Sequence, residues 1–73
     1  MRHAEMREID RAVSSAFEMV KDFASSDVGR RLSPTQLVSV IAIASAEEAD
    51  RLGMPRRFTT AKLREVADAL DHG

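Results

Sequence analysis

Two histidines are the first candidates for chemistry, because imidazole is the usual general base and a common metal ligand. His3 and His72 lie near the two ends of the chain. Chain ends fray, whereas a general base must stay within hydrogen-bond reach of the proton that it removes. We therefore interpret both histidines as solvated surface residues.

A cluster of carboxylates, formed by Glu47, Glu48 and Asp50, is the second candidate. Glu47 and Asp50 are three residues apart, so on a helix they share a face and could bind a hard cation. A calcium site needs six or more oxygen ligands at fixed spacing, and the sequence contains no such loop. The cluster predicts a solvated acidic face, and we expect no metal.

The sequence lacks other reaction motifs. None of its seven serines has a histidine nearby or lies in a Gly-x-Ser-x-Gly elbow. Gly29, Gly53 and Gly73 are isolated from one another, so no phosphate-binding loop is present. We expect neither an enzyme nor a cofactor.

The composition fits one small globular domain over residues 1–73. The chain has 44% hydrophobic residues, 11 basic and 12 acidic side chains, and no cysteine. This composition excludes a disordered chain and a disulfide-stapled scaffold, and the near-neutral charge gives no strong electrostatic case for nucleic acid. Residues 1–8 do not resemble a secretory signal, and no run of ~20 apolar residues could cross a membrane. We expect a cytoplasmic protein.

Apolar periodicity predicts an all-α fold with three helices, over about residues 5–25, 34–52 and 60–71. In the first helix, apolar residues recur at steps of three and four, the spacing of one helix face: Met6, Ile9, Val13, Ala16, Val20 and Phe23. Phe17, Met19 and Ala24 widen this stripe, which favours a bundle helix over a coiled coil. Polar residues 25–27 and Gly29 predict its end.

The second and third helices have recognisable start signals. Ser33 and Gln36 form a capping box around Pro34, and Gly53 with Pro55 ends the second helix. Thr59 is expected to cap the third helix. The expected core residues of the two helices are Leu37, Val38, Ile41, Ala44, Ala49 and Leu52, followed by Leu63, Val66, Ala67 and Leu70.

Two arginine doublets, Arg30-Arg31 and Arg56-Arg57, come just before the second and third helices. The segment from Ala49 to Met54 resembles the Ala-x-x-x-Gly-apolar signature at the turn of helix-turn-helix proteins. That resemblance implies DNA contacts from Arg56, Arg57, Thr60 and Arg64. The resemblance covers about six residues. It fails beyond them because Thr59 and Lys62 occupy positions that are apolar in the motif. In addition, the carboxylates of Glu47, Glu48 and Asp50 would lie near the DNA phosphates.

The second helix is apolar on two sides. Val40 and Ile43 point almost opposite to its core stripe, on a line that also holds Gln36 and Glu47. A chain of this size gains only about 3–5 kcal/mol from a single core, so association is a natural source of further stability. We therefore predict a homodimer that packs through this line of the second helix.

These patterns favour a small, non-enzymatic module that binds and modulates an unidentified partner protein. Its size suits an inhibitor, antiactivator or adaptor, of the kind that phages and other mobile elements encode. The alternative is a dimeric helix-turn-helix-like regulator that binds DNA through the start of the third helix.

Overall fold

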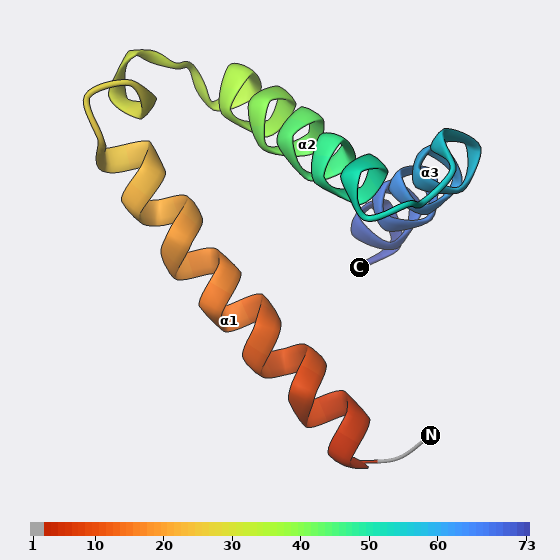
Figure 1. Ribbon diagram of the computed structural model, residues 1–73. Helices are drawn as coiled ribbons and strands as arrows, with labels where there is room; N and C mark the ends of the chain where they lie inside the picture. The colour runs from red at the N-terminus through yellow and green to blue at the C-terminus, as the bar shows by residue number, and fades with distance from the viewer. Residues whose placement is uncertain (1–2) are drawn as a thin grey trace. The chain divides into compact units, whose positions relative to one another are not determined.

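The computed structural model describes the backbone of residues 3–73 and the side chains of residues 6–73. Its elements are α1 (His3–Ser25), a 3-10 turn η1 (Gly29–Arg31), α2 (Pro34–Arg51) and α3 (Arg56–His72) (Figure 1). No strand occurs among these residues, so the all-α prediction with three helices is confirmed. The chain forms two compact units, Met1–Val38 and Ser39–Gly73, and we describe each by itself. The single-domain organisation stays a prediction.

Local hydrogen bonds end α1 at Ser25, where the sequence predicts the end. The Ser26 hydroxyl donates to the Phe23 carbonyl (2.6 Å) and accepts from the Gly29 amide (3.1 Å). The chain passes so close to the end of α1 that a Cβ on Gly29 would lie 1.9 Å from the Phe23 carbonyl oxygen. Glycine is therefore the only residue that fits at position 29 without a shift of the backbone.

A capping box begins α2 as predicted. The Gln36 amide donates to the Ser33 hydroxyl (3.1 Å), and the Gln36 side-chain oxygen accepts from the Ser33 amide (2.9 Å). Pro34 occupies the first helical position, where its missing N–H leaves no bond unmade. The side chains of Ser33 and Gln36 thus each satisfy one of the backbone N–H donors that the start of a helix leaves free.

The turn from α2 to α3 is a Schellman motif built on Gly53. The Met54 amide donates to the Ala49 carbonyl (3.0 Å) and the Gly53 amide to the Asp50 carbonyl (2.9 Å). Gly53 has a φ of 94°, in the left-handed region that glycine adopts without a steric penalty. Helix α2 ends at Arg51, one residue before the predicted end.

Helix α3 begins four residues earlier than predicted, at Arg56, so the prediction of Thr59 as its cap is wrong. Pro55 precedes the helix, and its carbonyl accepts from the amides of Phe58 (2.9 Å) and Thr59 (3.2 Å). Proline presets φ near the helical value and needs no amide partner, so the chain turns helical directly after it. Thr59 instead lies inside the first turns of α3 and is buried.

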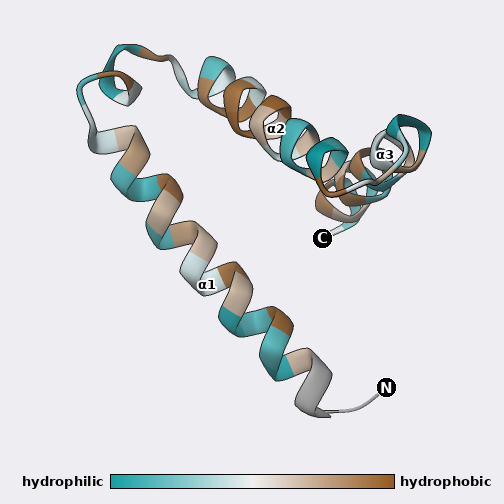
Figure 2. Ribbon diagram, in the orientation of Figure 1, coloured by the Kyte–Doolittle hydropathy of each residue, from teal (hydrophilic) through white to brown (hydrophobic). Residues whose placement is uncertain are grey.

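Apolar side chains along α1 are left uncovered by the rest of their own unit. Figure 2 shows apolar and polar residues alternating along this helix, as an amphipathic stripe requires. Within its unit the stripe lacks a covering helix, and five of its residues are 52–69% exposed: Met6, Ile9, Val13, Phe17 and Met19. None of the helices in the described part of the chain is long and apolar enough to cross a bilayer.

Candidate interaction surfaces

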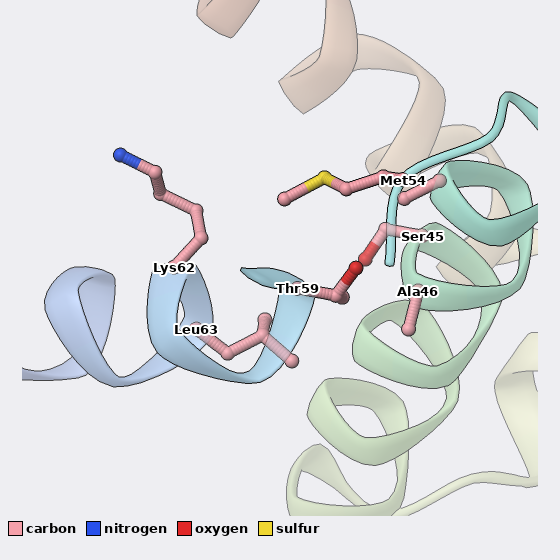
Figure 3. Close-up of a pocket in the computed structure, with 7 residues that line it drawn as sticks. Ser45, Ala46, Met54, Thr59, Lys62 and Leu63 are labelled. Atoms are coloured by element: carbon pink, nitrogen blue, oxygen red, sulfur yellow. The ribbon is translucent and has the colours of Figure 1, made fainter. Parts of the chain in front are cut away.

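Small side chains make the contact between α2 and α3. Ala46 of α2 and Thr59 of α3 are the two buried residues at this junction, with 9% and 6% of their surface exposed. Beside them lies an open, apolar hollow of about 180 Å³ (Figure 3). Its lining comes from α2, the turn and α3, and consists of Ser45, Ala46, Ala49, Met54, Thr59, Lys62 and Leu63.

The expected core stripe of α2 is therefore only partly correct. Ala49 is half-buried as expected, but Val38 and Leu52 are 69% and 71% exposed. Helix α2 turns its line of small residues toward α3, because small side chains let two helix backbones approach closely. Sequence periodicity favoured the larger aliphatic residues instead.

Thr59 carries a buried hydroxyl without a hydrogen-bond partner. Its Oγ1 has almost no contact with solvent and no donor or acceptor among the described residues. Figure 3 shows this side chain directed toward Ser45 of α2. The Ser45 hydroxyl, however, donates to its own helix, to the Ala42 carbonyl at 3.0 Å. An unsatisfied buried hydroxyl destabilises a fold by about 1–3 kcal/mol.

The two polar residues that depart from the helix-turn-helix signature both line the hollow, but only one of them is buried. Thr59 is 6% exposed, whereas Lys62 is exposed and its Nζ pairs with Glu65 at 3.0 Å. The residues that join the helices are Leu52–Pro55, a short turn that contains glycine, as in helix-turn-helix units. Burial of Thr59 fits the apolar position that it would occupy in that signature, whereas exposure of Lys62 does not.

The residues predicted for self-association do not act as one set. Ile43 is 62% exposed and Val40 is 36% exposed. At 100° per residue, Val40 points about 120° and Ile43 about 60° away from Ala46 around the axis of α2. Gln36 is engaged in the capping box. Glu47 pairs with Arg56 of α3 at 3.3 Å, so its carboxylate already has a partner within the chain.

The residues predicted to contact DNA lie on the first three turns of α3. Arg56 pairs with Glu47. The Cζ atom of the Arg57 guanidinium lies 5.2 Å from the centroid of the Phe58 ring, in a cation–π contact. Thr60 donates its hydroxyl to the Arg56 carbonyl at 3.1 Å. Among the described residues, no carboxylate pairs with Arg57 or Arg64. Two of the three predicted arginines therefore keep their charge open to a ligand.

The acidic cluster is neutralised in part by arginine. Arg51 forms a two-pronged ion pair with Glu48, with one bond from Nε at 2.9 Å. This hydrogen bond lowers the pKa of the Glu48 carboxyl and raises that of Arg51. No group of three or more metal-ligating side chains occurs among the residues described. The three carboxylates are exposed, as the sequence predicts, and the ion pairs of Glu47 and Glu48 are an addition that it does not predict.

The histidines remain at the ends of helices. His72 is the last residue of α3, and its Nδ1 lies 2.7 Å from the Asp68 carbonyl oxygen, which accepts when Nδ1 is protonated. The side chain of His3 lies outside the described residues.

Comparison with protein families, curated proteins and solved structures finds no match to this chain.

Proposed function

We propose that this chain is a non-enzymatic, cytoplasmic helical module that associates with itself and binds and modulates a partner protein. Inhibitor, antiactivator and adaptor are the roles that fit, including those of phage or mobile-element accessory proteins. The observation that supports the proposal is the amount of unpartnered apolar surface. Ala46 is the one buried apolar side chain among residues 6–73, whereas fourteen larger ones are at least 36% exposed. Large apolar patches at a protein surface mark interaction sites.

Self-association through α2 rests on Val40 and Ile43. Neither residue lines the hollow between α2 and α3, and Ile43 in particular is largely exposed. Gln36 and Glu47 bound this patch with polar groups, an arrangement of apolar centre and polar rim that is typical of interfaces. Their bonds to Ser33 and Arg56 hold both side chains in place before any partner arrives.

Replacing Ile43 by glutamate should dissociate the dimer, because a charge would be buried in an apolar contact on both copies. We expect the dissociation constant to rise by about a hundredfold or more. Sedimentation equilibrium over a range of concentrations measures this change. Val38→Glu is the matched control, since Val38 is equally apolar and exposed on the other side of α2. A monomeric parent, or an unchanged mass in Ile43→Glu, would contradict the α2 interface.

A second candidate function, DNA binding, is favoured by the geometry of α3. The basic residues occupy its N-terminal turns, where the helix dipole disfavours positive charge. At 100° per residue, Arg57 and Arg64 point about 160° and 140° away from Thr59, which faces α2. Thr60 lies between them and Thr59, about 100° from Thr59. The first turns of a recognition helix contact base edges in helix-turn-helix complexes. Arg57 and Arg64 are the free cations that could meet phosphates.

For this second function, the double variant Arg57→Ala, Arg64→Ala should weaken duplex DNA binding about tenfold or more in low salt. The slope of log affinity against log salt should flatten by about 2, because two phosphate contacts are lost. Fluorescence anisotropy with a duplex oligonucleotide measures both quantities. The control is Arg7→Ala, Arg11→Ala in α1, which removes the same charge elsewhere. Absence of binding by the parent in low salt, or an equal loss in the control, would exclude this function.

A further inference from the structure

The apolar stripe of α1 has the spacing of a coiled-coil seam. Taking Met6 as position a, the heptad places Met6, Val13 and Val20 at a and Ile9, Ala16 and Phe23 at d. The helix is continuous over all three heptads, from His3 to Ser25. A strict alternation of three and four residues keeps the seam facing a neighbour of the same period along its whole length.

The stripe is large enough to hold a second chain. Helix α1 has 23 residues, which makes it about 34 Å long. Its five most exposed apolar residues together present roughly 600 Å² to solvent, against about 800 Å² per partner in a standard interface. Val20 and Phe23, both half-buried, continue the same face. The exposed stripe therefore supplies about three quarters of the area per partner in a standard interface, before Val20 and Phe23 are added.

The flanks of the stripe are complementary to themselves. In a parallel, in-register pair, each g residue lies beside the e residue five positions later on the other helix. Ala12 would then meet Phe17 of the second copy, and Met19 would meet Ala24 of the second copy. Each contact joins a large side chain to a small one, as close packing requires. The residues that widen the stripe thus fit another α1.

We infer that α1 pairs with α1 of a second copy of this chain as a parallel, two-stranded coiled coil. This inference rests on the proposed homodimer and assigns its main seam to α1 in place of α2. It departs from the bundle helix that the width of the stripe predicts, because the residues that widen the stripe fit the flanks of a second α1. Valine occupies the a positions of the second and third heptads, as in two-stranded coiled coils, whereas none of the three d positions carries the leucine that usually accompanies it there. Phe17 is held at the edge of the seam by Lys21, whose ammonium lies 5.3 Å from the ring centroid and pairs with Glu18 at 3.5 Å.

Substitutions at single seam positions test this inference in the full chain. Val13→Glu should raise the dissociation constant about a hundredfold or more, because two carboxylates would be buried in one layer. Ala16→Leu should lower it about tenfold by filling a d position. Ser15→Glu on the polar face of α1 is the control and should change nothing. Sedimentation equilibrium gives the mass, and circular dichroism at the same concentrations reports the helix content.

The strand direction is tested with a cysteine, since the chain has none of its own. A parallel, in-register pair brings the two copies of position 9 within disulfide distance, whereas an antiparallel pair separates them by about 16 Å. Ile9→Cys should therefore form an interchain disulfide under mild oxidation, and Ser15→Cys should not. A dimer of Ile9→Cys that fails to cross-link would overturn the parallel pairing.

The outcomes separate this inference from the α2 interface. Dissociation by Val13→Glu but not by Ile43→Glu would support the α1 seam and reject the α2 one. Dissociation by Ile43→Glu alone would reject the α1 seam and leave the proposed dimer standing. If the unsubstituted protein is a trimer or a larger assembly, the two-stranded pairing is rejected. If it is a monomer, both the α1 and the α2 interfaces are rejected.

Discussion

Replacing Gly29 by alanine is expected to lower the free energy of unfolding by about 2–4 kcal/mol, the largest change in stability that we predict for a single methyl group. The added Cβ would lie 1.9 Å from the Phe23 carbonyl oxygen and 2.8 Å from the Ala24 Cα. Both atoms belong to the backbone of α1, so no side-chain rotation can relieve the overlap. To accept the added methyl group, the C-terminal end of α1 must therefore move away from η1.

Thermal unfolding followed by circular dichroism measures this effect. For a chain of this length, such a loss corresponds to a fall of more than about 10 °C in melting temperature. Gly53→Ala is the matched control, because position 53 has open space around its Cβ but a left-handed φ. That variant should lose only about 1 kcal/mol. Equal melting temperatures for the two variants would contradict the close approach at Gly29.

Replacing Thr59 by valine is expected to stabilise the protein by about 1–2 kcal/mol. Valine has the shape of threonine and removes the hydroxyl that is buried without a partner. The gain should appear as a rise of about 4–16 °C in melting temperature, measured under the same conditions. A stabilised variant would show that the polar group at the α2–α3 junction reduces the stability of the fold.

Thr60→Val is the control for this substitution. Thr60 is the next residue along α3, and its hydroxyl donates to the Arg56 carbonyl at 3.1 Å near solvent. Its removal should change the melting temperature little, because exposed hydrogen bonds contribute little net free energy. Destabilisation by Thr59→Val would mean that the hydroxyl has a partner in solution, such as a bound water.

Features set by neighbouring residues could be predicted from the sequence. The capping box needs only Ser33 and Gln36, three residues apart, so its two hydrogen bonds follow from local geometry. The end of α2 likewise follows from Gly53, whose left-handed conformation stops the helix. The number of helices was correct for the same reason.

Features set by distant contacts could not be predicted. Thr59 has the chemistry of a helix cap, and only the fold of α3 onto α2 shows that it lies inside the helix. The pairing of Glu47 with Arg56 joins residues nine apart across the turn, which periodicity on a single helix cannot reveal. The stripe of α1 was visible in the sequence, but its exposure depends on what else its unit contains.

The bonds that begin and end the helices have a consequence for the rate of assembly. They join residues only three to five positions apart, as at Ser33–Gln36 and at the end of α1. Folds dominated by such short separations form fast, and single helices relax in about a microsecond or less. Two copies at about 1 µM meet productively only every 0.1–10 s. In the proposed dimer, productive encounter of two copies, and not folding, would therefore set the rate at which the associated state forms.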